Sequence, residues 1–152
     1  MKTKRIYIDT SVIGGCYDIE FKEYSNKLFE YFNNAYYIPV ISNVVIAELV
    51  DAPEKVRKKL EGIQEKIDTV IITEEMIALS KKYLDEKIVT KKYSDDALHI
   101  AVATVSKVDV LVSWNFKHIV NLDKIHKFNA VNLIEGYSLL EIRTPREVID
   151  NE

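Results

Sequence analysis

The sequence predicts a three-layer α/β domain, in which a parallel sheet is covered by helices on both faces. Short apolar runs that are typical of buried strands alternate along the chain with longer segments of helical periodicity. This alternation favours a parallel sheet, because each connection between parallel strands needs a crossover, usually a helix. The 152 residues are 47% apolar, enough for one core and too few for two, so we expect residues 1–152 to form one domain.

Runs rich in isoleucine, valine and tyrosine predict the strands, and apolar residues at helical spacing predict the helices. Pro39 lies inside the second run and is a caution, because proline cannot donate a hydrogen bond to a sheet. We expect strands at residues 4–8, 36–41, 69–72, 108–113 and 138–143. We expect helices at residues 21–32, 44–50, 53–67, 74–84, from residue 95 onward and at 123–135, with a final helical turn at 146–149.

Residues with known capping preferences support several of these boundaries. A side-chain hydroxyl or amide before a helix can accept a hydrogen bond from the first turn, and glycine favours the left-handed conformation after the last turn. Helix caps are expected at Ser42 or Asn43, Thr73, Ser94 and Gly136. The backbone at residues 14–16, Gly-Gly-Cys, is instead expected to be loose.

Composition restricts the classes of function. A net charge of −3 excludes a protein that binds nucleic acid through its overall charge, so a polyanion must meet a local basic patch. The single cysteine, Cys16, excludes an internal disulfide and a thiol-rich zinc site, and it fits a reducing compartment. No apolar stretch has the length of a membrane span and no leader pattern is present, so we expect a cytoplasmic protein without a membrane partner.

Three carboxylates stand where the pattern expects apolar or turn residues. Asp9 follows the first strand, Glu48 lies in the short helix after the second, and Asp96 lies in the first turn of a later helix. Asp9 would lie at the carboxyl end of a parallel strand, where open α/β sheets build their sites. Burying such groups unpaired is costly, and no lysine or arginine accompanies them at strand or helix spacing. Oxygen ligands without histidine or cysteine clusters select Mg²⁺ or Mn²⁺.

Each carboxylate also has a purely structural interpretation. Asp96 can stabilise the positive end of a helix dipole, Asp9 can form an Asx turn, and Glu48 can be a solvated side chain. Such positions are common in proteins, so spacing alone does not decide between the two interpretations. The three carboxylates together favour a site more strongly than any one of them.

Four short motifs occur in order along almost the whole chain. They are Ile8-Asp9-Thr10-Ser11-Val12, Ile46-Ala47-Glu48-Leu49, Asp96-Ala97-Leu98-His99-Ile100-Ala101 and Leu111-Val112-Ser113-Trp114-Asn115-Phe116. Their order and separation resemble those of the PIN-domain nucleases, and within these the VapC-type toxins of prokaryotic toxin–antitoxin pairs. The resemblance implies a Rossmann-like sheet in strand order 3-2-1-4-5 and metal-dependent hydrolysis of RNA.

The resemblance also implies site residues. Asp9, Glu48 and Asp96 match the catalytic acidic residues of the family, which would hold Mg²⁺ or Mn²⁺, and Asp95 is then an auxiliary or a surface acid. Asn115 is a departure, because many PIN nucleases have a further aspartate there. An amide oxygen can ligate a metal or orient a water, but it brings no charge and cannot act as a base. Asn115 is therefore a candidate catalytic residue that puts a symmetric two-metal mechanism in doubt.

Other residues are candidates for supporting roles, each with a structural alternative. The hydroxyls of Ser11 and Ser113 could bind the carboxylates or a substrate phosphate, or satisfy the local backbone. His99 follows Asp96 by one helical turn and could be its hydrogen-bond partner or a packed core residue. The candidate RNA contacts are Lys91, Lys92 and Lys117 for phosphates, and Trp114 for stacking on a base.

The resemblance implies three partners: an RNA substrate, a small antitoxin protein, and a second copy of the chain in a homodimer. Two other functions remain open. One is a PIN-fold module that binds RNA or protein and is catalytically weak or inactive. Asn115 is the residue that favours this alternative. An aspartyl phosphatase is disfavoured, because haloacid-dehalogenase-type enzymes carry a second aspartate two residues after the nucleophile, where this chain has Ser11.

Overall fold

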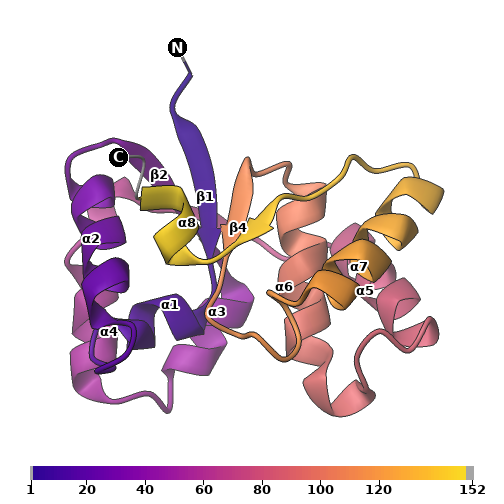
Figure 1. Cartoon of the computed structure of the whole chain (residues 1–152), viewed down its shortest axis with the longest axis horizontal. Coiled ribbons are helices and arrows are strands. Elements are labelled where there is room, and N and C mark those ends of the chain that lie inside the picture. The colour runs from indigo at the N-terminus through magenta and orange to yellow at the C-terminus, as the bar shows by residue number, and fades with distance from the viewer. Residues whose placement is uncertain (1, 150–152) are drawn as a thin grey trace.

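The protein is built on a five-stranded sheet, seen in a computed structural model that describes residues 2–149. All neighbouring strands are parallel and their order is β3-β2-β1-β4-β5, which confirms the predicted α/β fold and strand order (Figure 1). The strands are β1 (Lys4–Ile8), β2 (Tyr37–Ser42), β3 (Asp68–Val70), β4 (Val110–Val112) and β5 (Ile142–Arg143).

Strand β1 lies at the centre of the sheet. Tyr7 pairs with Val40 of β2 on one side and with Leu111 of β4 on the other. The last three residues of β1 are at most 1% exposed, as expected for a parallel strand covered on both faces. The chain therefore delivers the next residue, Asp9, to the middle of the carboxyl edge of the sheet.

Helices cover the sheet on both sides. In Figure 1, α2, α4 and α8 lie on one side of β1, and α5, α6 and α7 lie on the other. Right-handed crossovers explain this division, because connections that run toward the β3 edge and connections that run toward the β5 edge fall on opposite faces. The helices are α1 (Thr10–Gly15), α2 (Lys22–Asn33), α3 (Asn43–Leu49), α4 (Glu54–Glu61), α5 (Glu74–Asp85), α6 (Ser94–Val105), α7 (Leu122–Ile134) and α8 (Pro145–Ile149).

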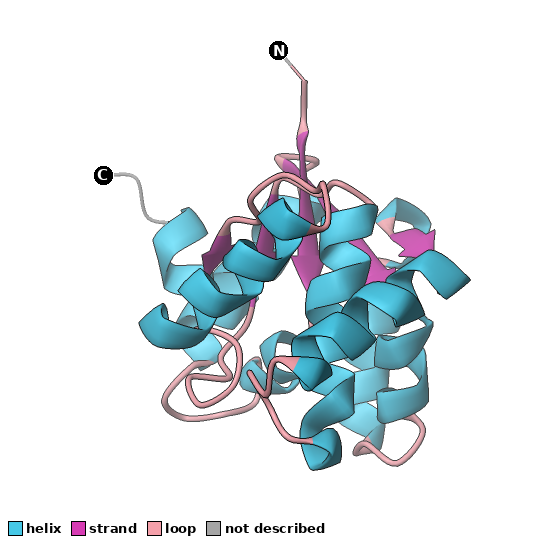
Figure 2. Ribbon diagram, turned by 90° about the vertical axis from the view of Figure 1, so that its right-hand side faces the viewer, coloured by secondary structure: helices cyan, strands magenta, loops and turns pink. Residues whose placement is uncertain are grey.

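The last helix is tied to the first half of the chain by two tyrosines. The hydroxyl of Tyr31 donates to the carbonyl of Ile149 at 2.6 Å, and the hydroxyl of Tyr37 donates to the carbonyl of Val148 at 2.7 Å. Figure 2 shows the resulting arrangement, in which the strands run between packed helices. None of the helices over residues 2–149 is long and apolar enough to cross a membrane.

Helix α1 is the main element that the sequence did not predict. The Asp9 side chain caps it by accepting from the backbone N–H of Val12, and the glycines that were expected to loosen the backbone lie inside it. Gly15 is required for packing rather than for flexibility. A Cβ there would lie 2.6 Å from Ser25 Oγ and 2.8 Å from the indole nitrogen of Trp114.

Several element boundaries also differ from the prediction. The helix expected over residues 53–67 ends at Glu61, because Gly62 forms its C-cap and a short 3₁₀ helix, η1 (Gln64–Lys66), follows. The strand expected over residues 138–143 is only two residues long, because the Asn129 side chain binds the backbone of Leu140 in place of a neighbouring strand.

The expected caps are partly confirmed. Ser42 and Thr73 accept hydrogen bonds from the first turns of α3 and α5, and Gly136 follows α7 with a φ of 90°. Ser94 is not a cap, because a 3₁₀ turn, η2 (Lys91–Tyr93), runs directly into α6 and leaves Tyr93 at the N-cap without a side-chain bond.

Candidate active site

The carboxyl ends of β1, β2 and β4 bring the candidate residues to one edge of the sheet. Asp9 follows β1, α3 begins directly after β2 and carries Glu48, and Ser113 follows β4. The two outward connections diverge between β1 and β4, which makes this the topological switch point where ligands bind in open α/β sheets. Helix α6 adds Asp96 from its first turn.

Asp9 is buried and fully hydrogen-bonded. Only 4% of its surface is exposed, and its two oxygens each accept a hydroxyl hydrogen bond of 2.6 Å, one from Ser11 and one from Ser113. Burial raises the pKa of Asp9, while the charge of His99 and the hydroxyl bonds act in the opposite direction. Asp9 therefore has a structural role as the N-cap of α1, and both serines predicted for supporting roles bond to it.

Glu48 is half-buried and is held through one oxygen. Its Oε1 accepts from the hydroxyl of Thr10 at 2.6 Å and from Nε2 of His99 at 2.9 Å. Burial alone would raise the pKa of Glu48, but the bond and charge of His99 and the Thr10 bond together lower it, so the carboxylate is ionised at neutral pH. Thr10 was not singled out from the sequence, although it lies in the first motif beside Asp9.

His99 does not pair with the expected partner. It is 1% exposed and bonds Glu48, whereas Asp96 acts on it only through charge. His99 is therefore a packed and hydrogen-bonded core residue, as the structural alternative predicts. Burial would lower the pKa of His99, but the Glu48 bond and the carboxylates of Asp9, Glu48 and Asp96 raise it overall.

Asp96 is less enclosed than Asp9. Burial raises its pKa to about 6, with His99 opposing, the negative charges of Asp9 and Glu48 adding to the rise, and the Asn115 amide lowering it. These charge effects show that the three carboxylates lie within one another's electrostatic field. Unlike its neighbour Asp96, Asp95 is exposed, as the surface interpretation of that residue expects.

Asn115 is engaged in the loop that follows β4. Its Oδ1 accepts from the backbone N–H groups of Lys117 at 3.2 Å and His118 at 2.9 Å. With that oxygen committed to the backbone, the Asn115 amide is left to face Asp96. Asn115 thus fixes the loop and steadies Asp96, and it does not present a free oxygen to a metal or a water.

The chemistry of the donor set suits a hard divalent cation, but the set is not assembled as a cluster. Among the ion pairs of residues 2–149, none joins Asp9 or Asp96 to a lysine or arginine, and Glu48 pairs only with His99. Carboxylate oxygens are the ligands that Mg²⁺ and Mn²⁺ prefer. Within the same part of the chain, no three histidine, cysteine, aspartate or glutamate side chains already stand as a metal-binding group.

The prediction that Trp114 stacks on a base is wrong, because its ring is buried. Trp114 is 8% exposed, stacks on Phe21 with ring centroids 4.2 Å apart, and donates its indole N–H to Ser25. The ring is therefore part of the core, while the backbone N–H of Trp114 supports the site by donating to Ser11 Oγ at 2.9 Å.

The lysines predicted to contact RNA are exposed, and two of them lie near a pair of aromatic rings. Tyr93 stacks on His118 with centroids 4.0 Å apart, and the Lys92 ammonium lies 5.6 Å from the Tyr93 ring centre. Burial lowers the pKa of His118, and so do the charges of Lys117 and Lys124, which indicates positive potential at this loop. Lys91, Lys92 and Lys117 are all exposed to solvent.

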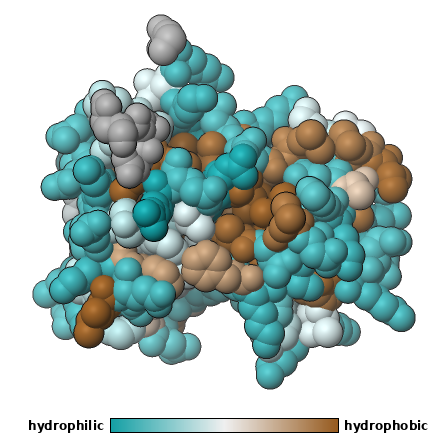
Figure 3. All heavy atoms as spheres, in the orientation of Figure 1, coloured by the Kyte–Doolittle hydropathy of each residue, from teal (hydrophilic) through white to brown (hydrophobic). Residues whose placement is uncertain are grey.

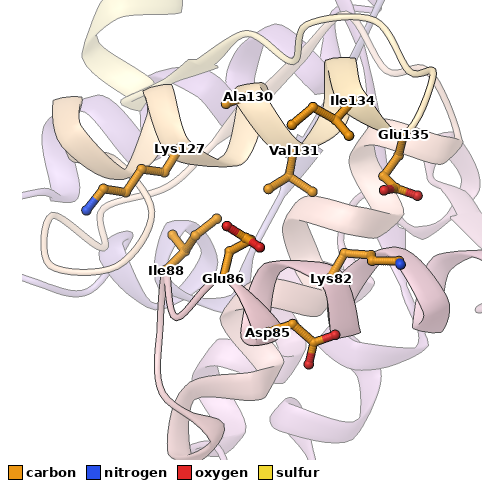
Figure 4. Close-up of a pocket in the computed structure, with 9 residues that line it drawn as sticks. All are labelled: Lys82, Asp85, Glu86, Ile88, Lys127, Ala130, Val131, Ile134 and Glu135. Carbon is orange, nitrogen blue, oxygen red and sulfur yellow. The ribbon is translucent and has the colours of Figure 1, made fainter.

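A separate hollow lies between α5 and α7, away from the carboxylates. It measures about 420 Å³ and has an apolar floor that includes Ile88 and Val131, with charged residues at its rim (Figure 4). Exposed apolar side chains continue at Leu133, Ile134 and Leu139, where Figure 3 shows hydrophobic atoms gathered over α7 and the segment that follows it. None of the candidate catalytic residues lines this hollow.

Comparisons with known proteins support the fold. No protein-family model matches the sequence, and no curated protein matches it. Fourteen chains of solved structures are similar to this one. One belongs to the crystal structure of VapBC2 from Rickettsia felis bound to a DNA fragment from their promoter, with a TM-score of 0.54 and 19% sequence identity over 74% of this chain and 89% of that chain. At this identity the likeness concerns the fold alone.

Proposed function

We propose that the protein is a metal-dependent endoribonuclease of the PIN-domain type, which hydrolyses RNA phosphodiester bonds. The observation that carries the proposal is the placement of Asp9, Glu48 and Asp96 within one another's electrostatic field at the switch point of the sheet, where no ion pair of residues 2–149 joins Asp9 or Asp96 to a lysine or arginine. His99 offsets part of the negative charge of these carboxylates, and a divalent cation would offset the rest together with that of an RNA phosphate.

Asp9, Asp96 and Glu48 are the residues that would hold Mg²⁺ or Mn²⁺. When bound, the ion supplies charge stabilisation at the phosphoryl oxygens. Glu48 is ionised, and its Oε2 is the oxygen left free by Thr10 and His99, so it can orient an attacking water. Ser11 and Ser113 keep Asp9 in place, and Asn115 steadies Asp96.

Exposed lysines beside the site would hold the RNA. Lys91 and Lys92 come from the turn before α6, and Lys117 comes from the loop that Asn115 fixes after β4. These positions flank Asp96, so a strand of RNA that contacts them would pass over the carboxylates. Such contacts give affinity through phosphate charge and carry no sequence information.

We further propose that the protein is the toxin of a VapBC-type pair, active in the cytoplasm as a homodimer and restrained by a small antitoxin. The four sequence motifs and the similarity to VapBC2 support this assignment. Mass measurement in solution, alone and after coexpression with the product of any adjacent small gene, tests both partners. A strict monomer at micromolar concentration would rule out the homodimer.

A binding module without cleavage is the second candidate function. The observations that favour it are the carboxylates that are not assembled as a metal group and the Asn115 oxygen that is committed to the backbone. Such a module would bind RNA or a protein partner equally well with and without divalent cations.

Cleavage of end-labelled structured and unstructured RNAs with Mg²⁺, Mn²⁺ or EDTA separates the two functions. The variants are Asp9→Asn and Asp96→Asn, with Asp95→Asn as the matched control, because Asp95 is an exposed neighbour on the same helix. The nuclease requires metal-dependent cutting that the first two substitutions abolish and the third leaves intact. Absence of cutting over a wide RNA panel, by folded protein free of antitoxin, would favour the binding module.

A further inference from the structure

A chain of buried polar groups is hydrogen-bonded to Glu48. Nδ1 of His99 lies 2.7 Å from the hydroxyl of Tyr7, which in turn lies 2.7 Å from Oγ of Ser42. Tyr7 and Ser42 are fully buried and His99 is 1% exposed. Through Nε2 of His99 the chain ends on Oε1 of Glu48, so it joins the centre of β1, the end of β2 and the core of α6 to one carboxylate.

The chemistry of the groups fixes the direction of the bond to Glu48 and the partner of every other group. An ionised carboxylate only accepts, so Nε2 of His99 carries a proton and donates it to Glu48. Nδ1 of His99 accepts from the Tyr7 hydroxyl when the ring is neutral, and it donates to the Tyr7 oxygen when the ring is protonated. Ser42 Oγ accepts from the backbone N–H of Val44 at 3.2 Å and shares a second hydrogen bond with the Tyr7 hydroxyl. Every group keeps the same partner in both protonation states, so the chain admits one orientation of the imidazole.

This chain of hydrogen bonds makes the two oxygens of Glu48 unequal. Thr10 and His99 converge on Oε1 from α1 and from α6, so the carboxylate is clamped from two elements. The other oxygen, Oε2, accepts no hydrogen bond from the residues in the described range 2–149 and is the one left for the site. A rotation of the imidazole would release this clamp.

We infer that Tyr7, Ser42 and His99 are positioning residues, which orient Glu48 so that its free oxygen faces the carboxylate site. The inference rests on the proposed function for the chemical role of Glu48. The positioning itself does not require RNA or a metal, so it can be tested in the protein alone.

The chain offers a matched control for a buried tyrosine hydroxyl. Tyr83 is fully buried like Tyr7, and its hydroxyl is also hydrogen-bonded, to Oδ1 of Asn132 between α5 and α7. Tyr83 lies outside the candidate site. Tyr7→Phe and Tyr83→Phe therefore remove the same atom from equally buried places, and only Tyr7→Phe breaks the connection to Glu48.

The first test is the exchange of the His99 Nε2 proton with solvent, followed by NMR of the imidazole in the full chain at one pH. The signal is assigned by its loss in His99→Gln. We expect slow exchange in the wild type and in Tyr83→Phe, and exchange at least about tenfold faster in Tyr7→Phe, because the imidazole loses its fixed orientation. Equal exchange rates in the two phenylalanine variants would overturn the inference, whether or not the protein cuts RNA.

The second test uses rescue by a conservative variant. His99→Gln keeps an N–H that can reach Glu48, whereas His99→Leu keeps only bulk. Loss of a group that orients a metal-binding carboxylate typically costs roughly 10–100-fold in metal affinity or activity. We expect Mn²⁺ affinity and the cleavage rate to fall by this factor in His99→Leu and to recover partly in His99→Gln. Equal losses in both variants, at equal thermal stability, would reduce His99 to a core residue. If the wild type cuts no RNA while the proton-exchange result holds, the proposed function fails and the positioning stands.

Discussion

Asp9 and Asp96 lie at the same edge of the sheet, but they differ in burial and in hydrogen bonding. Asp9 is 4% exposed and both of its oxygens are bonded to serine hydroxyls. Asp96 is partly exposed, is bonded to the Asn115 amide, and has its pKa raised to about 6, chiefly by burial. The comparison shows that one carboxylate is built into the scaffold, whereas the other retains repulsion that a cation would relieve. Three predictions test this difference.

The largest effect is expected from the hydroxyl that holds Asp9 in the core. Ser113→Ala leaves Oδ2 of a buried carboxylate without its donor, and such an orphaned group costs about 1–3 kcal/mol of unfolding free energy. Ser11→Ala should cost less, because Ser11 is only half-buried and water can take its place. Urea denaturation of both variants measures the difference. An equal loss in the two variants would mean that Asp9 is not enclosed as described.

A smaller effect of opposite sign is expected at Asp96. Its pKa is raised from 3.8 to about 6 by folding, so the folded protein binds more protons than the unfolded chain between these values. The contribution of Asp96 to stability is therefore complete below about pH 4 and is lost as pH rises through about 6. Without divalent cations, Asp96→Asn should be more stable than the wild type at pH 7, and the difference should shrink toward pH 4.

Thermal unfolding from pH 4 to pH 7 in EDTA checks this sign, with the exposed Asp95→Asn as the control. A wild type that is more stable than Asp96→Asn at pH 7 in EDTA would show that Asp96 is already neutralised within the protein, and the contrast with Asp9 would disappear.

The smallest effect is expected from the lysines beside Asp96. Lys92→Ala and Lys117→Ala should each weaken RNA binding and reduce the slope of log affinity against log salt by about 0.7, the value for one phosphate contact on a single strand. Lys58→Ala is the control, because Lys58 lies on α4, across β1 from α6, and pairs with Glu54 (Figure 1). Filter binding at several salt concentrations with the cleavage-deficient Asp9→Asn supplies the slopes. An unchanged slope in both variants would remove these lysines from the RNA path.

The strands and the three carboxylates could be predicted because they depend on local pattern. A buried parallel strand is continuously apolar, and a carboxylate that interrupts an apolar pattern stands out. Together with the family resemblance, this was sufficient for the strand order and for the placement of Asp9, Glu48 and Asp96 at one edge.

The missed features depend on contacts between distant residues. Helix α1 was not predicted because Gly14 and Gly15 are residues that usually break helices. Gly15 is needed there because a side chain would collide with Trp114, nearly 100 positions later. Helical spacing offered Asp96 as one possible partner of His99, but the imidazole reaches across to Glu48 on another helix. Trp114 lies beside Asn115 in sequence, yet its ring turns into the core to meet Phe21. The spacing of residues along one helix or strand does not indicate which distant residue a side chain contacts.

The most direct test of the central claim is calorimetric titration of the protein with Mn²⁺ at pH 7.5. If Asp9 and Asp96 serve one cation, the wild type and Asp95→Asn should bind Mn²⁺ with equal affinity, and both Asp9→Asn and Asp96→Asn should lose binding. Affinity should also fall as pH is lowered through about 6, where the Asp96 carboxyl takes up a proton. Binding that survives both substitutions, or the absence of binding by folded wild-type protein, would contradict the account.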